Sequence, residues 1–386
     1  MNFKNPLIRI GFAEVFAKVL SWASLAIIPF FASPVVYGEV SLNYSMILLF
    51  LPLFLFGQDR LILKGEPGKE LIVSFKFTIV VWLLTSVILL LFDLFFIAFA
   101  ALFLTLNKLY LTYYRAEEKY NCYALNRVIY SVFRLIFVVA VVYFFYSPTA
   151  YIFSELFAAG LATVAMFVFI VKSGFFQKFD FTKRFLHGFP LMLHGVSLLG
   201  IGVADRFILK TYVDFDAVGN YSFIYVFASG LIFLFSIVSI IYEKKIYKSD
   251  DRKSLLNNVK QTLGLMLGIG LIGSFVSIVL FTLIFKFNLI KGYGFYINEL
   301  VLLLLAHAIL PFYLVSNYIL IQQDKAKLLL LTSFVSFAVN VAFNLYLIPQ
   351  YGLQGAVWAT LMANFMLVIF VMVMCAQVLK KNESYK

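Results

Sequence analysis

The apolar residues of the chain fall in long continuous runs separated by short polar stretches, without the alternation typical of a half-buried strand. A helix needs about 20 mostly apolar residues to cross the hydrocarbon core of a bilayer, and most of the runs reach that length. The pattern therefore predicts an all-α polytopic membrane protein with about 12 transmembrane helices. The expected spans are roughly 9–30, 38–58, 72–92, 94–112, 126–146, 150–171, 188–209, 219–241, 262–285, 298–320, 328–348 and 354–377.

One apolar run is too long for a single crossing. Residues 73–111 form a run of about 39 residues, which would be about 58 Å long as one helix. Because that length is roughly twice a bilayer core, the run must fold back on itself. The polar residue Asp93 after Phe92 marks the expected turn.

The distribution of Lys and Arg along the connections sets the expected orientation. With the N-terminus placed inside, 25 of the 31 Lys and Arg residues fall in inside segments. The outside segments contain only Arg206, Lys210, Lys286 and Lys291. Since cytoplasmic loops carry the excess of basic residues, we expect a multi-pass protein of the cytoplasmic (inner) membrane with both termini in the cytoplasm.

The composition supports this class and excludes several others. Hydrophobic residues make up 63% of the chain and charged residues only 13%, too few polar side chains to cover a soluble core. The net charge of +12 would suggest nucleic acid in a soluble protein, but here it fits basic loops facing acidic lipid, so no nucleic-acid partner is expected. The two Cys and three His are scattered, so neither a metal site nor a cofactor is expected.

The connections are also too short to hold a catalytic domain. The longest expected outside loop, near residues 287–298, has only about 12 residues. Membrane polymerases, ligases and glycosyltransferases usually carry their chemistry on large external loops. We therefore expect no enzymatic activity and no catalytic residues.

The two halves of the chain show short similarities. Gly38 after the first span matches Gly219 after the seventh, an offset of 181 residues, and each is followed three residues later by Ser. Arg134 and Asn340 also occupy matching places, each 15 residues after a Lys that follows an acidic residue. Such a duplication predicts two six-helix lobes with a substrate path between them. The expected parts are an N-terminal lobe at 1–172, a cytoplasmic linker at 173–187 and a C-terminal lobe at 188–386.

Four stretches of sequence resemble one family of membrane proteins. They are the turn Ser33-Pro34-Val35-Val36-Tyr37-Gly38, the segment Tyr114-Arg115-Ala116-Glu117-Glu118-Lys119, the span from Gly188-Phe189-Pro190 to Asp205-Arg206, and the block from Asn340 to Ala356. The last is the most specific, with N-x-x-x-N followed by I-P-x-Y-G-x-x-G-A. On these residues, and over nearly its whole length, the chain resembles the Wzx-type polysaccharide flippases of the multidrug/oligosaccharidyl-lipid/polysaccharide exporter superfamily.

The resemblance implies a transport function. The implied substrate is an oligosaccharide repeat unit linked to undecaprenyl pyrophosphate, carried from the cytoplasmic to the outer face by alternating access for O-antigen or another surface polysaccharide. The implied partners are this lipid-linked glycan, the bilayer, and the polysaccharide polymerase and chain-length machinery. An ion gradient is the implied source of energy.

Charged residues inside spans are costly and are therefore the first candidates for function. Lys18 and Glu14 form an i, i+4 pair in the first span, and Lys18 lies roughly 13 Å deep by the helical rise. They predict a cavity cation poised by a carboxylate, or a proton-coupled pair. A self-neutralised pair packed between helices is the other interpretation.

Further candidates lie in the fifth, sixth and eleventh spans. Arg134 can either bind pyrophosphate through its two-pronged guanidinium or extend to the cytoplasmic headgroups. Asn340 and Asn344 belong to a polar stripe that contacts either sugar or neighbouring helices. Glu155 is alone and shallow in the sixth span, where it faces either the cavity or a neighbouring helix.

Asp205 and Arg206 form the last pair of candidates. They lie some 27 Å along the seventh span by the helical rise, near the expected outer surface. They predict a gate or an ion-coupling site, with an interfacial anchor as the alternative.

Other functions compete with a polysaccharide flippase. A drug or organic-cation exporter of the same superfamily favours an acidic cavity, whereas the deep charges here are Lys18 and Arg134 against Glu14 alone. A lipid II flippase usually has extra helices, for which the chain leaves no room. A polymerase or ligase is disfavoured by the short outside loops.

Overall fold

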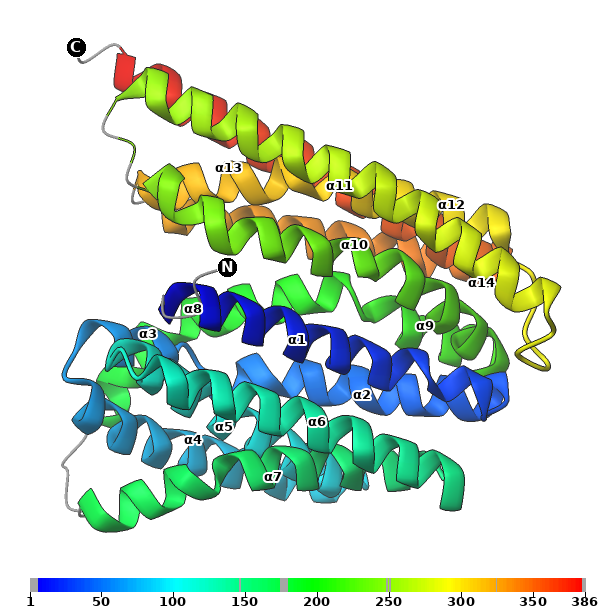
Figure 1. The fold of residues 1–386 in the computed structure, drawn as a ribbon, viewed down its shortest axis with the longest axis horizontal. Coiled ribbons are helices and arrows are strands. Elements are labelled where there is room, and N and C mark those ends of the chain that lie inside the picture. The colour runs from blue at the N-terminus through cyan, green and yellow to red at the C-terminus, as the bar shows by residue number, and fades with distance from the viewer. Residues whose placement is uncertain are drawn as a thin grey trace. The chain divides into compact units, whose positions relative to one another are not determined.

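The computed structural model describes residues 6–145, 147–173, 180–247, 249, 251–323 and 325–383, and these form helices and turns without a β-strand (Figure 1). The chain divides into two compact units. The first unit consists of Met1–Ala32 and Glu39–Leu199, and the second of Ser33–Gly38 and Gly200–Lys386. The predicted linker at 173–187 includes residues 174–179, which lie outside the described residues, and the predicted lobe boundaries stay a prediction.

Several helices in the first half of the chain begin at a proline. Pro6, Pro34, Pro67 and Pro148 occupy first helical positions, where the missing N–H costs nothing and the fixed φ favours the helix. Within the first unit α1 packs on α6, α6 on α7, α7 on α5, and α5 on α4. The elements up to residue 201 are α1 (Pro6–Ala26), the 3-10 helix η1 (Ile28–Phe30), α2 (Pro34–Leu55), α3 (Gln58–Lys64), α4 (Pro67–Leu90), α5 (Phe95–Ala116), α6 (Tyr120–Phe144), α7 (Pro148–Ser173) and α8 (Phe181–Ile201). They belong to the first unit, except that the first turn of α2 and the last two residues of α8 belong to the second.

The second unit contains the longest helices. Within it α10 packs on α11 and α12, and α14 packs on α9, α12 and α13. Its helices are α9 (Ala204–Tyr212), α10 (Phe215–Tyr247), α11 (Arg252–Lys286), α12 (Ile297–Ala308), α13 (Leu310–Gln322) and α14 (Ala326–Glu383).

The helices account for the predicted number of crossings. Among the described residues, ten helical spans are long and apolar enough to cross a bilayer, and α8 with α9 makes a further span bent by 53°. One of the ten, within α14, has 53 residues and would be about 80 Å long if straight. Gly352 interrupts it with a φ of 55° and a ψ of −130°, so its two sides are separate crossings. The described chain thus has ten to eleven candidate spans, or twelve when the two sides of Gly352 are counted apart, and the predicted all-α polytopic fold is confirmed.

Two predicted spans are each made of two helices. The span predicted at 188–209 is broken between Ile201 and Ala204, and the span predicted at 298–320 is broken at Ile309. The second break comes two residues before Pro311, which cannot donate a backbone hydrogen bond and clashes with the preceding turn.

The turn between α4 and α5 lies where the sequence predicts it. Residues 91–94 separate the two helices, and Asp93 has a left-handed φ of 57°, a conformation that Asp tolerates better than most residues. Helix α3, by contrast, is not predicted. It follows Gly57, whose φ of 68° ends α2 and starts a seven-residue helix.

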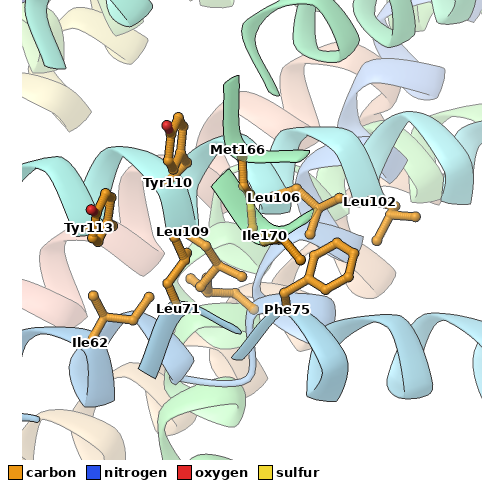
Figure 2. Packing of buried hydrophobic residues seen from close by; sticks show 11 residues of the cluster. Ile62, Leu71, Phe75, Leu102, Leu106, Leu109, Tyr110, Tyr113, Met166 and Ile170 are labelled. Carbon is orange, nitrogen blue, oxygen red and sulfur yellow. The ribbon is translucent and has the colours of Figure 1, made fainter. Parts of the chain in front are cut away.

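A buried apolar cluster joins α3, α4, α5 and α7 (Figure 2). Leu102, Leu106 and Leu109 of α5 recur at helical spacing and meet Phe75 of α4 and Met166 of α7. Water is not displaced when helices associate inside a bilayer, so close van der Waals packing of such side chains is what holds them together.

The two glycines that match in the sequence repeat mark a close backbone crossing within the second unit. A Cβ on Gly219 would lie 1.8 Å from the carbonyl oxygen of Pro34, and a Cβ on Gly38 would lie 2.1 Å from that of Phe215. Because only glycine lacks this atom, the start of α2 and the start of α10 can cross here at backbone distance.

Replacing Gly219 by alanine is expected to lower the melting temperature of the purified protein, because the added methyl overlaps backbone that cannot move aside. Overpacking of this kind costs about 1–3 kcal/mol. Gly264→Ala in α11 is the matched control, since a Cβ there meets nothing within 4 Å and alanine favours a helix by up to about 1 kcal/mol. Thermal unfolding in detergent, followed by circular dichroism, compares the two. Equal melting temperatures would contradict the close crossing.

Candidate functional site

Glu14 of α1 is surrounded by donors from α6. Its two oxygens accept hydrogen bonds from Arg127, from Nε at 2.9 Å and from Nη2 at 3.1 Å. The Tyr123 hydroxyl also donates to Glu14, and the Lys18 ammonium lies 3.9 Å from it. Tyr123 and Arg127 are one turn apart on α6, so both reach the same carboxylate. The structure therefore adds Arg127 and Tyr123 to the predicted Glu14–Lys18 pair.

The cations of this network are partly open to solvent. The side chains of Lys18 and Arg127 are 27% and 24% exposed, whereas that of Glu14 is 9% exposed. Both basic side chains are thus more exposed than the carboxylate that they bind.

Lys108 adds a further cation from α5. Its side chain is exposed, and among the described residues its ammonium group has neither a hydrogen bond nor a close ion pair. Asp59, Arg60, Arg115 and Arg127 are the charges that act on it electrostatically. It lies eight residues before the end of α5, roughly 12 Å inside the helix.

These residues form a region of positive charge in the first unit. Five cations there interact with two carboxylates, so the region keeps an excess of positive charge. We name as the cationic cluster Lys18, Arg60, Lys108, Arg115 and Arg127, together with Glu14 and Asp59.

Arg134 and Glu155 form a second ion pair in the same unit, but a closed one. Arg134 donates to Glu155, to the carbonyl oxygen of Ser21 at 2.9 Å and to the Tyr151 hydroxyl at 3.1 Å. Glu155 also accepts from the hydroxyls of Tyr130 at 3.0 Å and Tyr151 at 2.8 Å. The two charged side chains are only 3% and 0% exposed.

This geometry bears on two of the sequence-based expectations. Glu155 is not alone, because Arg134 and two tyrosines bind it. Arg134 extends into the helix packing rather than to the headgroups, and it can reach a pyrophosphate only by giving up the partners it has. Neither residue belongs to the cationic cluster.

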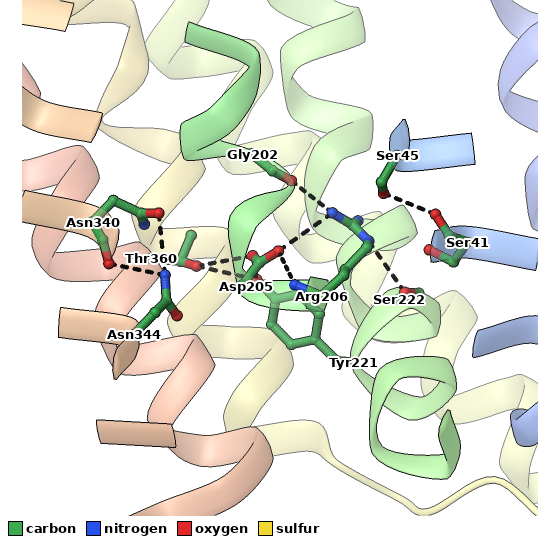
Figure 3. Close-up of polar contacts among 10 residues, drawn as sticks. All are labelled: Ser41, Ser45, Gly202, Asp205, Arg206, Tyr221, Ser222, Asn340, Asn344 and Thr360. Carbon is green, nitrogen blue, oxygen red and sulfur yellow. Dashed lines mark hydrogen bonds and ion pairs between the residues drawn. The ribbon is translucent and has the colours of Figure 1, made fainter. Parts of the chain in front are cut away.

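Asp205 lies fully buried in the second unit, where α9 meets α10 and α14 (Figure 3). The Tyr221 hydroxyl donates to its Oδ2, and Thr360 Oγ1 lies 3.5 Å from the same oxygen. Arg206 Nη1 is 3.5 Å from Oδ1. Such burial does not fit an interfacial anchor, which would reach water.

The Arg206 guanidinium is held mainly by groups other than Asp205. It donates to the Gly202 carbonyl oxygen at 2.6 Å and to the Ser222 hydroxyl at 3.2 Å. Its central carbon also lies 4.5 Å from the centre of the Tyr225 ring, a cation–π distance. Arg206 therefore fixes the packing of α9 on α10 and leaves one side of the Asp205 carboxylate to hydroxyl groups.

The predicted polar stripe of α14 is buried in the same unit. Asn344 Nδ2 donates to the backbone oxygen of Asn340 at 3.0 Å and to its Oδ1 at 3.1 Å (Figure 3). Three buried atoms, Asn340 Nδ2, Asn344 Oδ1 and Ser336 Oγ, have no hydrogen-bond partner among the described residues. A buried polar atom without a hydrogen bond destabilises the fold by about 1–3 kcal/mol. A ligand that formed hydrogen bonds with these atoms would remove that penalty, so the stripe can bind one.

The stripe and Asp205 belong to one region of the second unit. A Cβ on Gly200 would lie 2.4 Å from the Phe337 ring, so this part of α14 packs tightly on the segment that leads into α9. α9 and α14 pack together beyond this contact as well. The carboxylate of Asp205 on α9 and the hydroxyl and amide oxygens of Thr360 and Asn344 on α14 thus lie on two helices that pack together.

The sequence pattern does not single out Lys108, Arg127 or Tyr123. Lys and Arg near the ends of spans also determine orientation, and both cations were counted there as cytoplasmic charges. Two signals were available: the i, i+4 spacing of Tyr123 and Arg127, and the eight residues that separate Lys108 from the end of its span.

No protein-family model and no curated protein sequence matches the chain. Solved structures do share its fold. The lipid II flippase MurJ in an inward closed conformation superposes with a TM-score of 0.69 at 16% identity, covering 95% of this chain and 87% of that chain. An outward-facing MATE multidrug resistance transporter gives 0.66 at 11% identity, covering 99% and 97%.

A third structure with this fold is a MOP superfamily transporter from Pyrococcus furiosus. It has a TM-score of 0.57 at 13% identity and covers 96% of this chain and 95% of that chain. It is described as having a binding pocket of reverse polarity that suggests a different function. The fold of this chain is therefore the one found in transporters of the MOP superfamily.

Proposed function

We propose that the chain is a flippase that carries an oligosaccharide linked to undecaprenyl pyrophosphate from the cytoplasmic to the outer face of the inner membrane by alternating access. The observation that carries this proposal is the cationic cluster, whose accessible charges are Lys18, Arg127 and Lys108. The translocated repeat unit would be used to build O-antigen or another surface polysaccharide, with the polymerase and the chain-length machinery as partners. Both termini would lie in the cytoplasm.

The cluster suits a diphosphate for physical reasons. A phosphate group is expensive to bring to the depth of a bilayer unless cations neutralise it. The Arg127 guanidinium offers two parallel donors that match phosphate oxygens. Lys108 offers a compact charge that, among the described residues, makes no hydrogen bond or close ion pair. The lipid tail would remain in the bilayer while the head crosses in the cavity.

The proposal is tested by reconstituting the purified protein in vesicles with a fluorescent oligosaccharide on undecaprenyl diphosphate. A membrane-impermeant quencher reports how fast the label moves between leaflets. Protein-dependent movement supports a flippase. Movement no faster than in protein-free vesicles overturns it.

A multidrug or organic-cation exporter is the second candidate, because MATE multidrug transporters share this fold. The charge of the cluster argues against it, since a cationic drug would meet Lys18, Arg127 and Lys108. The same vesicles distinguish the two: uptake of a cationic dye without movement of the lipid-linked glycan would favour the exporter.

We further propose that a small cation or a proton binds at Asp205 and couples transport to an ion gradient. Two features support this: the buried carboxylate with the Tyr221 and Thr360 hydroxyls, and in the same region the Asn344 amide oxygen, which has no hydrogen-bond partner among the described residues. Small hard cations prefer such oxygen ligands.

Asp205→Asn is expected to abolish the response of flipping to an imposed sodium or proton gradient, because the amide has nearly the same shape but no charge. Flipping without a gradient should continue. Glu299→Gln is the control, since Glu299 is the other buried carboxylate described in the second unit and bonds Gln354 at 2.9 Å. A full gradient response in Asp205→Asn would exclude this site.

A further inference from the structure

Glu14 occupies the position in the cationic cluster that an anionic ligand would take. Its two oxygens accept from Nε and Nη2 of Arg127 at 2.9 and 3.1 Å, and we call these two parallel donors the fork of Arg127. The Tyr123 hydroxyl and the Lys18 ammonium approach the same carboxylate. Two phosphate oxygens would be bound by the two guanidinium donors of Arg127 in the same way. The cations are thus neutralised by a group that belongs to the protein.

We propose that Glu14 is a resident anion: it occupies the cations while no substrate is bound, gives up the fork of Arg127 when a diphosphate enters, and returns to it to release the substrate. This inference rests on the proposed function and concerns the same site. It assigns to Glu14 a role in the order of binding and release rather than in holding the substrate.

The exposed fractions indicate that an exchange can take place at this pair. The side chains of Lys18 and Arg127 are 27% and 24% exposed, so this pair lies partly open, whereas the side chain of Glu14 is 9% exposed. The Arg134–Glu155 pair of the same unit is only 3% and 0% exposed and cannot be entered in this way. The Glu14–Arg127 and Glu155–Arg134 pairs therefore contain the same chemical groups but differ in how exposed their side chains are.

The charges indicate the direction of the exchange. A diphosphate diester carries two negative charges and several acceptor oxygens, against one charge and two oxygens on Glu14, so the fork of Arg127 favours the substrate. Glu14 keeps partners when it leaves that fork, because Tyr123 still donates to it and Lys18 remains 3.9 Å away. After the substrate leaves, Glu14 again neutralises Arg127, so the empty protein does not keep an unpaired charge within a span.

The test uses the purified full chain and farnesyl diphosphate as a soluble probe. Without the competing carboxylate, Glu14→Gln should bind the probe about tenfold more tightly, the factor expected from freeing one charge-assisted hydrogen bond. It should also flip the lipid-linked glycan at least about tenfold more slowly, because release loses the returning anion. Glu14→Asp keeps the charge one methylene short of the fork and should fall between wild type and Glu14→Gln.

Glu155→Gln is the matched control, since it makes the same chemical change in the closed pair. It should lower thermal stability and leave the affinity for farnesyl diphosphate unraised. If Glu14→Gln instead binds the probe more weakly than wild type, as Arg127→Gln should, Glu14 is a structural partner and the inference is overturned while the proposed function stands. If wild type itself binds no farnesyl diphosphate, the proposed function fails, and the inference with it.

Discussion

Replacing Lys108 by alanine is expected to slow flipping of a diphosphate-linked glycan about 10- to 100-fold while the protein remains folded. The side chain is exposed and its ammonium group has no hydrogen bond or close ion pair among the described residues, so its loss breaks no such described contact. A hydrogen bond to a charged group is worth about 1.5–3 kcal/mol, and each 1.4 kcal/mol is about tenfold. Lys108→Arg keeps the charge and should retain most of the rate.

The rate is measured in vesicles with equal amounts of each variant. Lys69→Ala is the control for a general loss of positive charge, because Lys69 is 58% exposed and already pairs with Glu66 at 2.7 Å. Its rate should match that of wild type. A wild-type rate in Lys108→Ala would place the diphosphate elsewhere and remove the main support for the proposed function.

Removing the Arg134 guanidinium is expected to destabilise the protein by about 3–5 kcal/mol, the usual cost of leaving one member of a buried ion pair without the other. In Arg134→Ala the Glu155 carboxylate stays fully buried, and the hydroxyls of Tyr130 and Tyr151 are the partners that remain for it among the described residues. Low abundance in the membrane should follow. The double variant Arg134→Met with Glu155→Met removes both charges together and should recover most of the loss.

Abundance and flipping of the double variant separate the two interpretations of Arg134. If abundance and flipping both recover, Arg134 and Glu155 serve only to pack the helices together. Recovery of abundance with flipping still absent would mean that Arg134 contacts the substrate, as its guanidinium allows. Melting temperatures in detergent provide the stability measurement independently of transport.

The positions of the spans could be read from the sequence because a bilayer dictates their length. The turn at Asp93 follows from a run twice as long as a bilayer core, and the interruption at Gly352 falls in the gap left between the last two predicted spans. The close crossing at Gly38 and Gly219 was visible as a repeat, although its physical meaning was not. These features depend on local length and on single residues.

The partners of the charged side chains could not be read in the same way. To place Glu155 against Arg134, or Arg127 against Glu14, one must know how each helix is rotated about its axis. In a soluble protein an apolar stripe gives that rotation. Here the helices are apolar on nearly every side, because lipid and protein neighbours are equally apolar. The polar contacts themselves set the rotation, so they cannot be inferred from it.

The break at Gly352 has a consequence for the synthesis of the protein. The two spans of α14 follow each other without a loop, and a Cβ on Gly355 would lie 2.3 Å from the carbonyl oxygen of Leu347, so the two sides also touch at the break. Only a few residues around Gly352 connect one span to the next. We therefore expect the last two spans to enter the bilayer together as a hairpin, so that a chain truncated shortly after Gly352 would leave the first of them without its partner.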